Sequence, residues 1–202
     1  WAAAASGAGS AVAAVLIALR IRHLNRRKLA VAGLGVLVVF DLLSALVGNI
    51  PMWLFIVVRG VAGIGGAAAY AAVMASYAEM ENSERGYGLF MVLQFAISAI
   101  GLYWLPYLLP SIGISGLYVC LAATVMLAFT QVGQVPGRAD VDSPEALEIK
   151  TLLAPAALLA MVGIGLFETA NNMHFTYAER IGIGFGITHE RVGAILGIVT
   201  VI

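Results

Sequence analysis

The chain has 202 residues, of which 61% are hydrophobic and 11% are charged, and its formal net charge at pH 7 is zero. Soluble domains contain about 45–50% apolar and about 25% charged residues, so this composition excludes an ordinary soluble protein. A net charge of zero gives no electrostatic basis for binding nucleic acid or an acidic partner.

The apolar residues are grouped in long blocks. Blocks of about 20 residues are long enough to cross a membrane as helices, and lipid offers their backbone groups no other hydrogen-bond partners. The predicted fold is therefore all-α, a polytopic bundle of transmembrane helices. In chain order the predicted helices cover residues 1–19, 29–48, 52–76, 88–109, 112–135 and 151–175, and a last one starts near 192. The first and last blocks lack a polar flank, so we expect the bundle to be truncated at both ends.

Basic residues mark alternate connections between these helices. Those after the first, third and fifth helices contain Arg20, Arg22, Arg26, Arg27, Lys28, Arg85, Arg138 and Lys150. The opposite side has only Arg180, in a predicted glycine-containing loop before the last helix, and Arg191. The positive-inside rule therefore places the loop 20–28 in the cytoplasm, in a multi-pass protein of the cell (inner) membrane.

One clearly polar segment, residues 136–150, interrupts the apolar pattern. It predicts a cytoplasmic linker between an N-terminal half, residues 1–135, and the start of a C-terminal half, residues 151–202. The single cysteine, Cys120, lies inside an apolar block and cannot form an internal disulfide. No metal-ligand spacing is present, so we expect no metal site and no cofactor.

Two opposite charges lie inside consecutive predicted helices. Asp41 and Arg59 are each about eight or nine residues from the turn near Pro51, so they lie at similar depth. A charge in a transmembrane helix costs roughly 2.5–3.5 kcal/mol and has to face protein or water. We therefore expect an ion pair, which either locks the two helices or couples transport to a proton or substrate.

The helix over 151–175 carries a polar stripe. Glu168, Asn171 and Asn172 share one face, because they are three and four residues apart. The stripe either faces a water-filled cavity and contacts substrate or a proton, with Glu168 as a candidate coupling charge, or is only the polar end of the helix. His174, nearer the surface, is predicted to be interfacial. Gln94 and Tyr70 are weaker candidates for a substrate cavity.

The segment Arg59-Gly60-Val61-Ala62-Gly63-Ile64-Gly65-Gly66-Ala67 resembles the fourth-helix motif of major facilitator superfamily transporters. That motif is an arginine followed four residues later by Gly-x-Gly-x-Ala. Small residues let helix backbones approach closely, so Gly63, Gly65 and Ala67 are predicted packing positions. Generic helix packing also explains the glycines, although it does not explain the arginine.

The rest of the chain is similar to helices two through eight of the twelve in this superfamily. Asn25-Arg26-Arg27-Lys28 looks like the end of the short basic motif between helices two and three, which implies a cytoplasmic gating loop. The family's acidic residue would fall near Arg22, which is basic here. Helix five, around 94–104, lacks the Gly-Pro pair of many antiporters.

The resemblance implies a secondary active transporter, not an enzyme. Such a permease, a symporter or an exporter, would move a small molecule by alternating access, with protons as a candidate coupling ion. Its partners would be that molecule and the lipid bilayer. One alternative is a non-transporting membrane assembly subunit. Another is an intramembrane serine protease, because Gly113-Ile114-Ser115-Gly116 spells a Gly-x-Ser-Gly string and His174 could be its partner.

Overall fold

The computed structural model describes residues 2–18, 24–137 and 177–200, together with 155, 159, 162, 163 and 166. These residues form α-helices, short 3₁₀ turns and connections, and no strand occurs among them. The predicted all-α fold is confirmed. Several residues of interest lie outside the described part of the chain: Arg20, Arg22, His23, Arg138, Lys150, Glu168, Asn171, Asn172 and His174.

The chain divides into two compact units. The first comprises Trp1–Val92 and Leu108–Ala139, and the second comprises Leu93–Tyr107 and Asp140–Ile202. The predicted boundary between two halves at residues 136–150 stays a prediction, because most of that segment lies outside the described residues.

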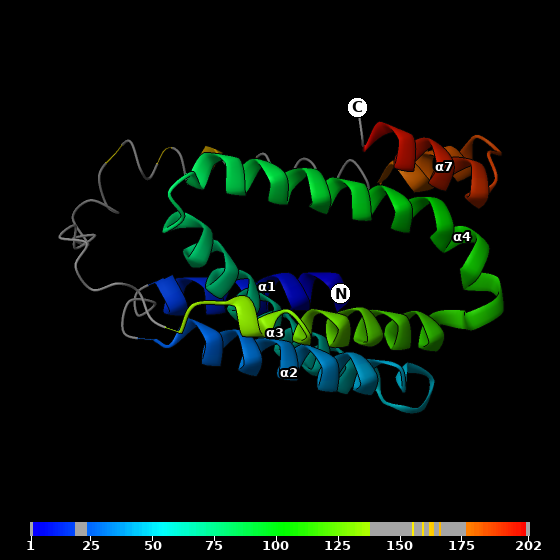
Figure 1. Cartoon of the computed structure of the whole chain (residues 1–202). Coiled ribbons are helices and arrows are strands. Elements are labelled where there is room, and N and C mark those ends of the chain that lie inside the picture. Colours follow the sequence, from blue (N-terminus) through cyan, green and yellow to red (C-terminus); the bar gives the residue numbers. More distant parts are fainter. Residues whose placement is uncertain are drawn as a thin grey trace. The chain divides into compact units, whose positions relative to one another are not determined.

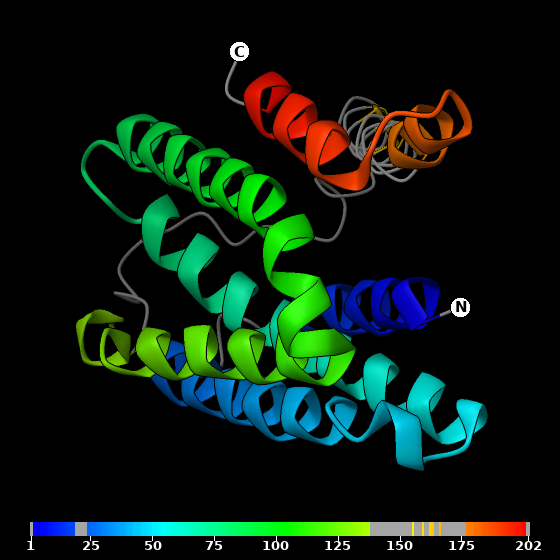
Figure 2. The same cartoon turned by 90° about the vertical axis from the view of Figure 1, so that its right-hand side faces the viewer.

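Three helices form most of the first unit: α1 (Ala2–Ala18), α2 (Arg26–Ser44) and α3 (Met52–Ala78). Both α1 and α2 pack against α3, and Figures 1 and 2 show the three helices lying side by side. Among the described residues, two helices are long and apolar enough to cross a membrane by length and composition, Met52–Ala78 and Ser83–Gln134. A shorter apolar helix covers Ala4–Ile17. Met52–Ala78 and Ala4–Ile17 agree with the predicted blocks, whereas Ser83–Gln134 covers both predicted helices 88–109 and 112–135.

The turn between α2 and α3 starts earlier than predicted. Helix α2 ends at Ser44 instead of near Gly48, and a 3₁₀ turn, η1 (Val47–Asn49), follows. Pro51 then takes the position before α3 with φ −65° and ψ 148°. Proline favours this place, because its ring presets φ and the start of a helix needs no backbone donor there.

Helix α4 (Ser83–Phe129) is interrupted inside its length. Gly113 has φ 64° and ψ −179°, a conformation that residues with a Cβ rarely adopt. The sequence placed the break at Pro110, three residues too early. A helix tolerates proline at the cost of a kink, whereas the Gly113 conformation cannot continue a helix. A second 3₁₀ turn, η2 (Val132–Gln134), follows α4.

In the second unit, residues 177–184 are helical, so the loop predicted there is wrong. The helix ends in a Schellman cap: Gly186, with φ 78°, donates to the Ile183 carbonyl, and Ile187 donates to the Gly182 carbonyl. Helix α7 (His189–Val199) follows. The glycines that suggested a loop are a helix cap and a packing site, because a Cβ on Gly182 would lie 2.7 Å from Val192 Cγ2.

Helix α7 packs on the α4 segment of the same unit. A Cβ on Gly193 would lie 2.7 Å from the Leu102 carbonyl oxygen, and one on Gly197 would lie 3.0 Å from that of Ala99. Figure 1 shows α7 alongside this part of α4. Glycine on α7 therefore allows close backbone approach, as is typical of helices that pack inside membranes.

Candidate functional site

The structure contains the ion pair expected from the sequence. Arg59 Nη1 of α3 donates to Asp41 Oδ1 of α2 at 2.6 Å. The side chains are 16% and 4% exposed, respectively. The pair lies within the long apolar stretches of both helices, so the two charges are placed where each would be costly alone.

Two further side chains complete this site. Arg59 Nη1 also lies 3.4 Å from Ser44 Oγ, whose hydroxyl donates to the Phe40 carbonyl at 2.7 Å. The Arg59 guanidinium carbon lies 5.2 Å from the centre of the Tyr118 ring, within the range of a cation–π contact. Phe55 holds that ring edge-on, with centroids 6.0 Å apart.

Sequence reasoning missed both Ser44 and Tyr118. Ser44 lies three residues after Asp41 on the same helix face, and this spacing was a usable signal. Tyr118 comes from the part of α4 beyond Gly113, and no local pattern connects it with Arg59. The arrangement places a carboxylate beside a guanidinium that also has Ser44 and Tyr118 as partners.

Small residues of α3 form two separate contacts. Toward α1, a Cβ on Gly63 would lie 2.0 Å from the Ser6 carbonyl oxygen, and Ser10 Oγ donates to the Gly63 carbonyl at 2.9 Å. Toward α2, a Cβ on Gly65 would lie 2.8 Å from the Gly33 carbonyl oxygen. Ala67 is half-buried. Gly63 and Gly65 thus lie where the backbones approach too closely for a larger residue, whereas the packing role of Ala67 stays a prediction.

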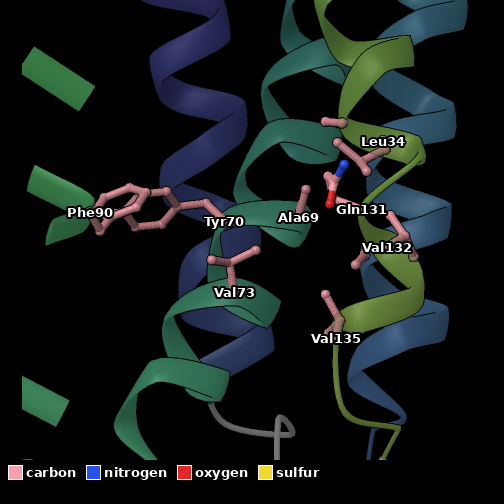
Figure 3. A pocket seen from close by; sticks show the side chains of 10 residues that line it. Leu34, Ala69, Tyr70, Val73, Phe90, Gln131, Val132 and Val135 are labelled. Atoms are coloured by element: carbon pink, nitrogen blue, oxygen red, sulfur yellow. The ribbon is translucent and has the colours of Figure 1, made fainter. Parts of the chain in front are cut away.

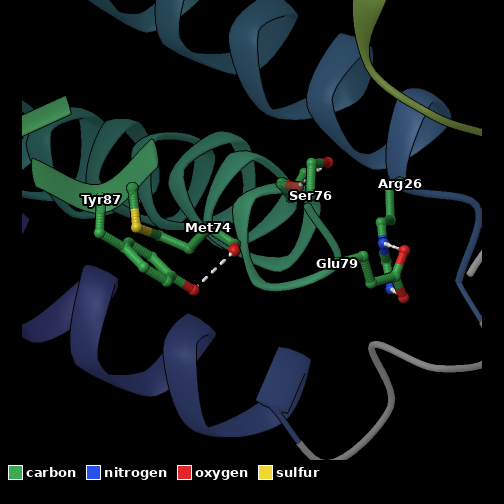
Figure 4. Close-up of polar contacts among 6 residues, drawn as sticks. Arg26, Met74, Ser76, Glu79 and Tyr87 are labelled. Carbon is green, nitrogen blue, oxygen red and sulfur yellow. Dashed lines mark hydrogen bonds and ion pairs between the residues drawn. The ribbon is translucent and has the colours of Figure 1, made fainter. Parts of the chain in front are cut away.

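Arg26, Arg27 and Lys28 were predicted in the loop 20–28, but they form the first turn of α2, which starts three residues earlier than expected. Arg26 links this turn to two other segments. This residue begins α2, is 5% exposed, and forms a two-pronged ion pair with Glu79, which follows the last residue of α3 (Figure 4). Its backbone N–H donates to the Gly137 carbonyl at 3.1 Å. Asn25 caps α2 by accepting from the Lys28 N–H at 3.0 Å, whereas Arg27 and Lys28 are exposed.

Comparison with known families decides the identity of the chain. The family model described as Major Facilitator Superfamily matches residues 1–202. The chain belongs to this superfamily. No curated protein and no solved structure matches it in the corresponding searches. The protein is therefore a multi-pass membrane transporter of this superfamily, and the recognition from the Arg59–Ala67 segment is confirmed.

In this superfamily member, the carboxylate that pairs with Arg26 does not come from the acidic position of the family's basic motif. The family's acidic position falls near Arg22, outside the described residues, and the sequence offers no acid there. Glu79 of the α3 terminus is the partner of Arg26 instead. The hydrogen bond from Arg26 holds the pKa of Glu79 below its usual range, although partial burial opposes this effect.

The Arg26–Glu79 pair should make stability sensitive to acid. Because the pKa of Glu79 is lowered in the folded state, its contribution is present above the ordinary value of 4.5 and is lost as the pH falls through the lowered value. Glu79→Gln should lower the melting temperature at about pH 7 and flatten its decline toward about pH 3. Thermal unfolding in detergent across this range measures both effects. The exposed neighbour Glu81 gives the control: Glu81→Gln should follow the parent.

Tyr70 and Gln94 are the weaker candidates for a substrate cavity. Tyr70 contacts Phe90 edge-on at 5.8 Å and lines a cavity of about 350 Å³ whose lining includes neither Asp41 nor Arg59 (Figure 3). Gln94 is exposed on the α4 segment of the second unit. The structure therefore does not join Tyr70 to Asp41 and Arg59 in one cavity.

Proposed function

We propose that this superfamily member is a proton-coupled secondary transporter of a small molecule, in which Asp41 takes up and releases the coupling proton. The observation that supports this is the buried Asp41–Arg59 pair, a carboxylate bound to a guanidinium between helices α2 and α3. Buried pairs stabilise a fold no better than apolar residues of similar size, so a pair at this position needs a reason beyond stability.

The surroundings of Arg59 support a two-state exchange of partners. When Asp41 is ionised, Arg59 is bound to it at 2.6 Å. When Asp41 takes up a proton, its attraction for the guanidinium falls, and the Tyr118 ring and Ser44 hydroxyl remain as partners. Protonation would then weaken the contact between α2 and α3, while Arg59 would keep Tyr118 and Ser44 as partners. Proton release would restore the ion pair.

The basic loop is proposed as the cytoplasmic gate. Arg26 holds the start of α2, the end of α3 and the segment at Gly137 together. Asn25 caps α2, and Arg27 and Lys28 in the first turn of α2 place positive charge at the membrane surface, as expected for a cytoplasmic side. Alternating access would require this connection to open when the transporter faces the cytoplasm.

The proposed substrate contacts rest on the sequence. Glu168, Asn171 and Asn172 form the polar face of a helix that lines the cavity in the fold expected from the resemblance, and Gln94 and Tyr70 are secondary candidates. The cytoplasmic placement of the basic residues likewise rests on their distribution along the sequence, and the inner-membrane location rests on the high alanine and glycine content. We propose no enzymatic activity, and Ser115 of the Gly-x-Ser-Gly string is exposed.

A ligand screen followed by flux measurements tests the proposal. Metabolites and drugs are first screened for a rise in the melting temperature of the parent and of Glu168→Gln and Asn171→Ala. The ligand found is then followed in proteoliposomes, in uptake driven by a pH gradient and in exchange at equal pH. Asp41→Asn should abolish driven uptake while keeping exchange, because only coupling needs the proton.

The controls separate coupling from helix locking. Glu84→Gln, an exposed carboxylate at the start of α4, should leave both fluxes unchanged. Loss of exchange and driven uptake together in Asp41→Asn would instead show that the pair only locks α2 to α3. If no ligand stabilises the parent, the proposed small-molecule site is wrong. If the ligand raises the melting temperature of the parent, Glu168→Gln and Asn171→Ala equally, the polar stripe is only the polar end of a helix.

A further inference from the structure

We propose that the cavity behind Tyr70 binds one acyl chain of an anionic phospholipid whose phosphate pairs with Arg27. Nothing in the transport proposal requires this site. It rests on an apolar cavity and a cation that the fold places at its end. Both belong to the first unit of the molecule.

The cavity lies between α2, α3 and both ends of α4. Its volume is about 350 Å³, within the roughly 300–1,000 Å³ of small-molecule sites. Figure 3 shows the side chains that line it, which are Ala30, Leu34, Ala69, Tyr70, Val73, Phe90, Ala128, Gln131, Val132 and Val135. The walls are almost entirely hydrocarbon, and they suit an apolar chain.

The amide of the lining residue Gln131 is engaged by its neighbours. Gln131 Nε2 donates to Thr130 Oγ1 at 3.1 Å, and Gln131 Oε1 accepts from Gln134 Nε2 at 2.7 Å. A polar soluble ligand needs several converging hydrogen-bond partners, which these walls do not supply. The wall at Phe90 is held in place one turn away, where Tyr87 Oη donates to the Met74 carbonyl at 3.1 Å (Figure 4).

Arg27 lies on the cavity side of α2. It is three residues before Ala30 and seven before Leu34, so the three share one helix face. Its Nη2 atom lies 3.8 Å from where a Cβ on Gly133 would be, next to the cavity residue Val132. Arg27 is exposed, and no ion pair to it occurs among the described residues.

An apolar cavity with a cation at its end fits a ligand with a hydrocarbon chain and an anionic head. Arginine near the end of a transmembrane helix lies at the level of lipid headgroups. Anionic lipids are attracted there by roughly 1 kcal/mol per basic residue, or about fivefold in affinity. A membrane phospholipid supplies both parts and is always present around a superfamily transporter. These charges and apolar walls therefore favour a phospholipid as the occupant.

Lipid titration followed by native mass spectrometry tests this site on the protein purified in detergent. The probes are dioleoyl phosphatidylglycerol and dioleoyl phosphatidylcholine, which share their chains and differ in net charge. The parent should retain one phosphatidylglycerol with about fivefold preference over phosphatidylcholine. Leu34→Trp, which fills the cavity, should weaken the binding of both lipids by at least about tenfold. Arg27→Gln should remove only the preference.

Matched variants distinguish the site from general lipid contact. Val39→Trp adds the same bulk at an exposed position of α2, and Arg85→Gln removes another exposed basic residue, so both should bind as the parent does. Val135→Trp fills the cavity from the opposite wall and stands in if Leu34→Trp fails to fold. Equal retention by the parent and both cavity-filling variants would overturn the proposal. So would an equal loss of preference in Arg85→Gln, or displacement of the lipid by a soluble transport substrate.

Discussion

Asp41→Leu or Arg59→Met alone should lower the free energy of unfolding by about 3–5 kcal/mol, and the double variant should recover most of this loss. Each single change leaves one charge inside the bundle without its partner. The desolvation free energy of that charge is then no longer offset by the ion pair. Removing both leaves two apolar side chains at a site surrounded by apolar helices. Unfolding by heat or denaturant in detergent gives the free energy of unfolding of the parent, the two single variants and the double variant.

The two single variants should not be equal. Asp41→Leu leaves Arg59, which is 16% exposed and retains Tyr118 and Ser44 as partners. Arg59→Met leaves Asp41, which is 4% exposed and has no other hydrogen-bond donor among the described residues. We therefore expect Arg59→Met to be the more destabilising change. A double variant as unstable as the sum of the singles would contradict this account, because the two charges would then act independently.

An exposed ion pair provides the reference for these measurements. Glu179 Oε1 lies 3.2 Å from His189 Nδ1, and both side chains are more than half exposed. Glu179→Gln should change the stability by no more than about 0.5 kcal/mol, since water already solvates both groups. The contrast isolates the effect of burial from the effect of losing a charge.

Gly63→Ala should destabilise the protein by about 1–3 kcal/mol, although alanine is the better helix former by about 1 kcal/mol. The added Cβ would lie 2.0 Å from the Ser6 carbonyl oxygen and 3.0 Å from Ser6 Cα. These are backbone atoms of α1, so no side-chain rotation can relieve the overlap and the two helices have to separate. The same separation would strain the hydrogen bond from Ser10 Oγ to the Gly63 carbonyl.

Gly66→Ala is the matched control on the same helix. Its new Cβ would meet only Leu37 Cδ1 at 3.6 Å, an ordinary contact with the end of a flexible side chain. We expect Gly66→Ala to keep or slightly raise the melting temperature, because the gain in helix propensity meets no opposing overlap. Equal melting temperatures for the two variants would show that α1 does not approach α3 at Gly63.

Helix α3 is the element on which both predictions depend. One side meets α1 through Gly63, and another meets α2 through Gly65 and the Arg59–Asp41 pair. The close approach to α2 is what brings the two charges within hydrogen-bond distance. In the proposed mechanism, a proton at Asp41 would act on an interface that is already tightly packed, and packed interfaces shift between discrete arrangements more readily than they deform.

The sequence by itself determined the membrane class, the all-α fold and the superfamily. Long apolar blocks in the chain permit only helices in lipid, and the arginine with its glycines carries the resemblance that the family match confirms. It also predicted that Asp41 and Arg59 would lie at one depth, because their distances from a turn at Pro51 follow from helical rise alone. Local spacing is sufficient for such features.

Only the tertiary structure decided the partners that come from distant segments. Tyr118 reaches Arg59, and Glu79 reaches Arg26, across helices whose rotation and register depend on side-chain packing. The end of the first α4 segment at Gly113 and the helix over 177–184 were also missed, because glycine suits a cap, a close contact and a loop alike. A glycine's role is fixed by the backbone angles and neighbours that the fold gives it, and a sequence pattern contains neither.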